Sequence, residues 1–307
     1  METLYLTHPA CKLHDMGDWH PESPQRLDAI NDQLLASGLH AYLSPQDAPR
    51  ANREALARVH DPAYLARLLD GQPIDGTRTL DPDTLQGPNT AVAALHAAGA
   101  GIAAVDAVLS GQALSAFCAV RPPGHHACRA RAMGFCFLNN VAIAARHAID
   151  VHGLTRVAIV DFDVHHGNGT EDILAGENRV LMCSFFQSPL FPNCGTENVA
   201  DNMLNVPVPA YTTGAGVREL VTQRWLPSLD VFRPQLILFS AGFDAHREDE
   251  MGQMGLVEAD YAWLTEQIMD VADRHAEGRA ISMLEGGYDL SALGRSVVAH
   301  VRALAKL

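Results

Sequence analysis

Short runs of apolar residues, each ending at polar or turn-forming residues, recur through the second half of the chain. They cover residues 116–120, 156–161, 180–185, 234–240 and 280–284. Apolar runs of this length are typical of strands in a parallel sheet that is buried on both faces. A similar run at residues 4–7 predicts a further strand near the start of the chain.

Segments with helical character separate these strands. Ser23 is placed to cap a helix that has Pro24 in its first turn and continues to about Ser37, before Gly38. Further helices are predicted over residues 62–69, 89–109, 139–151, 169–174, 215–226, 258–275 and 290–304. From residue 115 the strands and helices alternate, apart from a long loop after residue 185. This order predicts an α/β protein with a mostly parallel central sheet and helices on both faces.

The chain of 307 residues is predicted to form one domain, residues 1–307. No Ser/Gly-rich linker, charge block or internal repeat divides it. The candidate site residues lie between positions 125 and 288, so a domain boundary there would split the site. A hydrophobic content of 48% and a charged content of 19% predict a soluble protein with a sizeable core.

Charge and cysteine content narrow the class of protein. The formal net charge of −14, without a run of Lys or Arg, disfavours direct nucleic-acid binding. It would suit a cationic substrate, although an acidic soluble surface explains it more simply. Six cysteines without a C-x-x-C pair, and no basic segment followed by an apolar core at the N-terminus, predict a cytoplasmic protein. Residues 90–109 are apolar but contain His96 and Asp106, which favours a buried helix and no membrane span.

Polar side chains directly follow four of the predicted strands. The stretches are Arg121-Pro-Pro-Gly-His-His126, Asp161-Phe-Asp-Val-His165, Ser240-Ala-Gly-Phe-Asp244 and Leu284-Glu-Gly-Gly-Tyr288. Open α/β sheets bind ligands beyond the carboxyl ends of their strands, where the loops diverge and leave a crevice. The four stretches therefore predict a single site at one edge of the sheet.

Asp163, His165 and Asp244 are candidate metal ligands. Asp163 and His165 are two residues apart at a strand end, so their side chains project to the same side. Two carboxylates and one imidazole leave positions for water and substrate, which is typical of catalytic zinc, although iron(II) fits the same donors. His246 repeats the Asp-x-His spacing and leaves an arginase-like two-metal centre as a less favoured alternative to a place at the rim.

His125 and His126 are candidates for proton transfer, because the metal ligand set is sufficient without them. Asp161 is placed to accept a hydrogen bond from one imidazole and fix its tautomer, and Asn168 could do the same for the other. Tyr288 follows two glycines, and its hydroxyl could stabilise an oxyanion. A tyrosine packed by its ring, with the hydroxyl in water, is the simpler interpretation of that residue taken alone.

Together these motifs resemble the zinc-dependent histone deacetylase and acetylpolyamine amidohydrolase superfamily. The resemblance spans essentially the whole chain and also rests on His20-Pro-Glu-Ser-Pro-Gln-Arg26, Val59-His-Asp61, Gly134-Phe-Cys-Phe-Leu-Asn-Asn140 and His165-His-Gly-Asn-Gly-Thr170. It implies an arginase/deacetylase-like three-layer α/β/α fold and hydrolysis of an amide. Zinc on the three candidate ligands would polarise the acyl oxygen and activate water.

The same resemblance implies a role for each remaining candidate. His126 would act as the main general base and then acid, His125 would assist electrostatically, and Tyr288 would donate to the oxyanion. Phe135 and Phe191 would sandwich a linear acyl-lysine chain. Gly134 would line the same wall, and Asp83 would grip substrate amide hydrogens at the rim. A structural potassium ion would be held by Asp161, the Ser184 hydroxyl and the backbone oxygens of Asp163, His165 and Phe185.

Two positions refine the placement within the superfamily. Asn168 stands where nuclear class I members carry Asp, which resembles the class II and bacterial branch. Met251, next to Glu250, stands seven residues after Asp244, where polyamine-selective eukaryotic members carry a Glu gatekeeper. An apolar gatekeeper mildly favours peptide-borne or broader acyl substrates.

The leading hypothesis is a zinc-dependent deacylase that acts on acetylated or otherwise acylated lysine in a peptide or protein. Hydrolysis of acetylated polyamines is the runner-up. A non-catalytic acyl-lysine binding module and an arginase-like ureohydrolase are less favoured, and homo-oligomerisation is left open.

Overall fold

The central sheet contains eight parallel strands within residues 2–307, the part of the chain that the computed structural model describes. Their order is β2-β1-β5-β10-β9-β6-β7-β8, and every pairing is parallel. The strands are β1 (Thr3–Thr7), β2 (Leu43–Asp47), β5 (Ser115–Cys118), β6 (Val157–Asp161), β7 (Val180–Gln187), β8 (Met203–Val208), β9 (Leu236–Ala241) and β10 (Ala280–Leu284). The strands β5, β6, β7, β9 and β10 are buried at every position, as the apolar runs predict.

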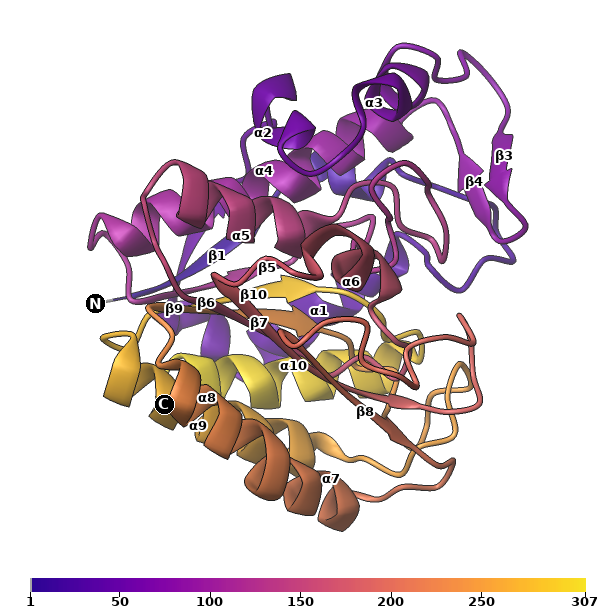
Figure 1. The fold of residues 1–307 in the computed structure, drawn as a ribbon. Coiled ribbons are helices and arrows are strands. Elements are labelled where there is room, and N and C mark those ends of the chain that lie inside the picture. Colours follow the sequence, from indigo (N-terminus) through magenta and orange to yellow (C-terminus); the bar gives the residue numbers. More distant parts are fainter. Residues whose placement is uncertain (1) are drawn as a thin grey trace.

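Helices cover both faces of this sheet and complete three layers (Figure 1). One layer contains α4 (Thr90–Leu109) and α5 (Asn140–Asp150), which pack on each other. The other contains α1 (Gln25–Ala36), α9 (Glu258–His275) and α10 (Leu290–Leu304), with α10 between α1 and α9. The remaining helices are η1 (Pro9–Lys12), η2 (Leu39–Tyr42), α2 (Arg53–Ala57), α3 (Pro62–Leu69), α6 (Asn168–Leu174), α7 (Gly214–Leu220), η3 (Val221–Trp225) and α8 (Leu226–Phe232). The predicted single α/β domain with a parallel sheet is confirmed.

The helix α4 is the only one in residues 2–307 that is long and apolar enough to cross a membrane by length and composition. Within its most apolar window 67% of the residues are buried inside the fold. Small residues along α4 allow this close packing, since Ala94, Ala97 and Ala98 are completely buried. The helix is therefore part of the core, as predicted.

Several local predictions are wrong. Ser23 does not cap α1 with its side chain; Pro24 is the N-cap residue, and Ser23 contributes only its carbonyl oxygen, to Arg26 N at 3.2 Å. The predicted helix 215–226 continues through a π-helical turn, η3, into α8, which ends at Phe232. Pro227 lies in the first turn of α8, directly after the π-helical turn; because proline has no N–H, a regular α-helical hydrogen bond cannot form at that position. The predicted loop after residue 185 contains the edge strand β8.

The strand order brings the four polar stretches together. The strands β5, β10, β9 and β6 are consecutive neighbours in the sheet, and each is followed by one of these stretches. Because the strands are parallel, their carboxyl ends lie at the same edge. The short antiparallel pair β3 (Arg78–Asp81) and β4 (Thr84–Gln86), which the sequence did not predict, brings Asp83 to this edge as well.

A buried cluster of charged side chains ties the N-terminal segment to the same edge. Glu22 accepts hydrogen bonds from Arg121 Nε and Nη2 at 2.5 and 2.7 Å and from Arg26 Nη1 at 3.0 Å. Arg26 Nε donates to Gly287 O at 2.7 Å. All three charged side chains are completely buried. Burial alone would raise the pKa of Glu22, but the charges of Arg121 and Arg26 lower it to about 2.

Replacement of Glu22 with Gln should therefore destabilise the fold strongly. It leaves two buried guanidinium groups without their counter-charge, which costs about 3–5 kcal/mol of unfolding free energy. Urea denaturation would measure this change. The matched control is Glu54→Gln, since Glu54 pairs with Arg58 at the same i,i+4 spacing but is 80% exposed, and it should change stability by no more than about 0.5 kcal/mol. Equal effects of the two substitutions would contradict a structural role for the buried cluster.

Candidate active site

The side chains of Asp163, His165 and Asp244 form a buried group with metal-ligand geometry. Their candidate ligand atoms lie within 4.8 Å of one another. His165 Nδ1 is 3.0 Å from Asp163 Oδ1 and 3.2 Å from Asp244 Oδ2. All three residues are buried, with exposures of 6% for His165, 1% for Asp163 and none for Asp244. The group can hold a single divalent cation on two oxygens and one nitrogen.

Electrostatics in this pocket also favour a cation. Burial and the charge of Asp163 raise the pKa of Asp244 to about 7. Burial alone would lower the pKa of His165, but hydrogen bonds and charges from the two carboxylates raise it to about 10. Without a metal, protons therefore offset the paired negative charges near neutral pH. A divalent cation can replace these protons, because metal ligands bind in their deprotonated forms.

Backbone groups from neighbouring loops hold the two carboxylates in place. Gly286 N donates to Asp163 Oδ2 and Val164 N to Asp244 Oδ1, both at 2.9 Å. A Cβ atom on Gly286 would lie 2.1 Å from Asp244 Oδ2 and 2.6 Å from Asp163 Oδ2. Only glycine allows the backbone to approach the ligands this closely.

Two histidines beside this group have different hydrogen-bond partners. His125 Nδ1 lies 3.0 Å from Asp161 Oδ2, and His126 Nδ1 lies 2.8 Å from Asn168 Oδ1. Asn168 Nδ2 faces the sulfur atoms of Cys128 and Met133, which directs its oxygen to His126. Both Nδ1 atoms are therefore donors, and each ring presents Nε2 on its other side.

The environments of the two rings drive their pKa values apart. Burial alone would lower the pKa of His125, but the charges of Asp163 and Asp161 raise it to about 10. Burial, together with the charges of His125 and His165, holds the pKa of His126 well below its usual value. His126 is thus a neutral imidazole with a free Nε2, which is the form that accepts a proton.

Tyr288 is held at the edge of the site by its backbone and by its ring. Its N–H donates to Asp249 Oδ2 at 2.6 Å, and its ring lies 5.8 Å from that of Phe135 in an edge-to-face arrangement. The guanidinium of Arg26 lies over the same ring at 5.0 Å. Burial and the charge of Asp244 hold the pKa of the Tyr288 phenol well above its usual value. The phenol remains a neutral hydrogen-bond donor.

A narrow cavity of about 120 Å³ leads to these groups. Its lining contains the five residues that the sequence suggested for substrate binding together with three from the site: Asp83, His126, Gly134, Phe135, His165, Phe191, Met251 and Tyr288. Phe191 packs edge-to-face on His126 at 5.1 Å. A slender, unbranched chain fits such a space.

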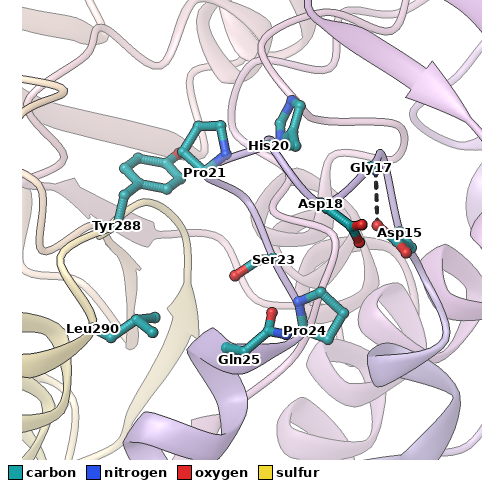
Figure 2. A pocket seen from close by; sticks show the side chains of 10 residues that line it. All are labelled: Asp15, Gly17, Asp18, His20, Pro21, Ser23, Pro24, Gln25, Tyr288 and Leu290. Atoms are coloured by element: carbon teal, nitrogen blue, oxygen red, sulfur yellow. Dashed lines mark hydrogen bonds between the residues drawn. The ribbon is translucent and has the colours of Figure 1, made fainter.

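Two wider hollows flank the mouth of this cavity, and both share Tyr288 with it. Figure 2 shows the larger, of about 450 Å³, with Asp15, Asp18 and His20 across from Tyr288. The other, of about 290 Å³, includes Glu248 and Glu250. Carboxylates therefore surround the entrance on two sides.

The residues suggested for a potassium ion also lie together. Asp161 of β6 and Ser184 of β7 are register partners, and Phe185 is next along β7. The buried Ser184 hydroxyl has no hydrogen-bond partner among residues 2–307. An unsatisfied buried oxygen beside a carboxylate is compatible with a monovalent cation.

His246 does not join the metal group. Its Nδ1 accepts a hydrogen bond from Glu248 N at 3.1 Å, and its Nε2 is 3.6 Å from Glu258 Oε1. Among residues 2–307, no second ligand set adjoins Asp163, His165 and Asp244. The geometry therefore gives no support to the two-metal alternative.

Two supporting residues had not been identified from the sequence. Glu285 Oε2 accepts from Gly124 N and His125 N at 2.6 and 3.0 Å, which fixes the loop of the two histidines. Asp249 accepts from the backbone of Tyr288 and Asp289. Glu285 stands inside a motif already singled out, whereas nothing in the sequence pattern distinguishes Asp249 from other acidic loop residues.

Comparison with known proteins agrees with this geometry. The family model for the histone deacetylase domain matches residues 20–304. The histone deacetylase-like amidohydrolase of Pseudomonas aeruginosa is 40% identical over 88% of this chain and 72% of its own length. The mouse polyamine deacetylase HDAC10 is 37% identical over 95% of this chain and 46% of its own. The crystal structure of the HDA15 HD domain aligns with a TM-score of 0.94 and 30% identity, over 100% of this chain and 89% of that one.

These matches cover nearly the whole chain and agree in fold. They also agree with the buried Asp, His, Asp group at the carboxyl edge of the sheet. The chain therefore belongs to the histone deacetylase domain family.

Proposed function

We propose that this protein is a zinc-dependent deacylase that removes acetyl or other acyl groups from lysine side chains in peptides or proteins. One observation carries the proposal: a small cavity is lined by the neutral His126, by Tyr288 and by His165, and His165 belongs to the buried Asp, His, Asp group. An extended alkyl chain with a terminal amide matches the shape of this cavity. The membership of the family supports amide hydrolysis.

Zinc bound by Asp163, His165 and Asp244 would supply Lewis-acid chemistry at the amide. The protein's own groups do the rest. His126 Nε2 takes a proton from the attacking water and passes it to the leaving amine, while Asn168 keeps Nδ1 protonated. His125, charged and fixed by Asp161, adds positive potential beside the reacting atoms. The Tyr288 hydroxyl donates to the oxyanion that forms from the acyl oxygen.

A potassium ion held by Asp161, Ser184 and nearby backbone oxygens is part of the proposal. The orphaned Ser184 hydroxyl supports it. Asp161 also accepts from His125 and from Asp163 N, so an ion at this carboxylate would stiffen the loop that carries the zinc ligands.

Acetylated polyamines are the second candidate substrates. Like acetyl-lysine, they have an extended alkyl chain that ends in an amide. They also carry a positive charge, which would lie outside the cavity. The carboxylates of Asp15, Asp18, Glu248 and Glu250 in the flanking hollows favour this alternative, as does the net charge of −14. The apolar side chain of Met251 at the tunnel wall favours lysine.

Steady-state assays of the zinc-loaded protein on an acetyl-lysine peptide and on an acetylated polyamine should separate the two candidates. We expect a higher kcat/KM for the peptide, with loss of both activities after chelation. Glu250→Gln should change the peptide reaction little, because Glu250 lies outside the tunnel. A preference for the polyamine that Glu250→Gln weakens would contradict lysine specificity, and no hydrolysis of either amide by zinc-loaded protein would contradict the enzyme assignment.

Tyr288→Phe should lower kcat by about 10²-fold or more, because it removes one oxyanion donor. Zinc content should stay at the wild-type level, since Tyr288 is not a ligand. Tyr211→Phe is the matched control, because Tyr211 is 76% exposed and absent from the cavity lining, and it should leave kcat unchanged. Near-normal turnover of Tyr288→Phe would remove the phenol from the reaction.

Zinc affinity should fall as the pH decreases. His165 holds a proton up to about pH 10 and Asp244 up to about pH 7 in the metal-free protein, and zinc must displace both. For each unit by which the pH decreases, the zinc affinity is therefore expected to fall about tenfold between pH 10 and pH 7, where only His165 holds a proton. Below pH 7, where Asp244 also holds one, it is expected to fall more steeply. Competition with a chelator of known pH dependence would measure the slope. An affinity independent of pH between 6 and 8 would contradict these protonation states.

A further inference from the structure

A second group of metal-binding side chains lies at the opposite edge of the sheet from the cavity. Asp106 is in the last turn of α4, His147 is in the last turn of α5, and His152 follows α5. The helices α4 and α5 lie side by side on one face and lead into β5 and β6 (Figure 1). Their C-terminal ends therefore lie at the amino ends of the strands, whereas the active site lies at the carboxyl ends.

The three side chains converge on one oxygen atom. Nε2 of His147 and Nε2 of His152 each lie 2.7 Å from Asp106 Oδ1. The candidate ligand atoms of all three residues lie within 4.8 Å of one another, and in residues 2–307 only the active-site group shares this property. Two imidazoles and one carboxylate are the donors that zinc and similar divalent ions prefer.

Small side-chain movements would convert this hydrogen-bonded arrangement into a coordination site. Two ligand atoms on a tetrahedral zinc ion stand about 3.3 Å apart at ordinary bond lengths. Each nitrogen to oxygen separation must therefore lengthen by about 0.6 Å from its present value. Asp106 and His152 can make this adjustment, since their side chains are 54% and 28% exposed. Their exposure also leaves room for a water molecule as fourth ligand.

The tautomer that a metal requires is accessible to the buried member of the group. Ligation through Nε2 places the imidazole proton on Nδ1. The Nδ1 atom of His147 is buried and has no hydrogen-bond partner among residues 2–307. The change of tautomer gives up the Nε2 hydrogen bond to Asp106 and leaves the Nδ1–H without an acceptor among these residues, so metal ligation must offset both losses.

We propose that Asp106, His147 and His152 form a second, structural binding site for a divalent transition-metal ion of the zinc type. The ion joins the C-terminal end of α4 to the C-terminal end of α5. It is independent of the catalytic centre, because it shares no residue with it and lies at the other edge of the sheet.

Metal analysis of the untagged full chain, after equilibrium dialysis against excess zinc, tests the proposal. Wild-type protein should bind one more zinc ion per chain than His152→Ala. The matched control is His275→Ala, because Asp230 accepts hydrogen bonds from His275 and Arg274 at 2.9 and 2.8 Å. That cluster also places two nitrogen atoms on one carboxylate oxygen, but a guanidinium does not bind metals, so this variant should retain the wild-type count.

A second measurement distinguishes zinc binding at this site from non-specific adsorption of zinc to the protein surface. Zinc should raise the melting temperature of wild-type protein and of His275→Ala more than that of His152→Ala, because only the first two keep the link between the helices. Equal zinc counts in wild-type protein and His152→Ala would overturn the proposal. All of these variants keep Asp163, His165 and Asp244. The difference in zinc count between them therefore tests the second site alone, whether or not the active-site group holds zinc.

Discussion

The structure depends on placing two carboxylates side by side in one buried pocket. Asp163 and Asp244 are both buried, and like charges at this distance oppose each other's ionisation. The surrounding groups all stabilise negative charge: the imidazole of His165, the charged ring of His125 and two backbone N–H groups. This arrangement is costly for a core that only has to be stable, and it is well suited to a divalent cation.

The order of the strands makes this concentration of charge possible. Residues from positions 121 to 288 meet because the four strands that precede them are neighbours in the sheet, although among the adjacent pairs only β9 and β10 are consecutive strands along the chain. The loops must then approach one another closely. At Gly286 the approach leaves no room for a side chain, because a Cβ atom there would overlap the carboxylate oxygens of Asp163 and Asp244. The buried ion cluster around Glu22 secures the same loops from the opposite side through Gly287. Fold and site therefore share the same polar contacts.

The sequence predicted the central strands well because they are buried at every position and mostly apolar. It failed at the sheet edges for a physical reason. The edge strand β2 has one buried residue in five, and β8 contains Pro207, which cannot donate to a strand ladder and which weakens a strand prediction. The candidate metal ligands, the two histidines and Tyr288 were identifiable because they follow buried strands, whereas Phe135 and Phe191 were suggested only by the family resemblance. Asp249 was not, since an isolated polar residue in a loop carries no periodic signal. The contact of Glu22 with Arg26 and Arg121 was not predicted either, because the motifs that contain them do not show which side chains meet.

Asp249 links the loop that carries Met251 to the loop that carries Tyr288. Asp249 accepts from Tyr288 N with one oxygen and from Met251 N with the other. The same buried carboxylate thus fixes the tunnel wall and the phenol, and its exposed neighbours Glu248 and Glu250 line the hollow outside. In the proposed reaction, one buried side chain thus positions both a residue of the cavity wall and the tyrosine that would donate to the oxyanion.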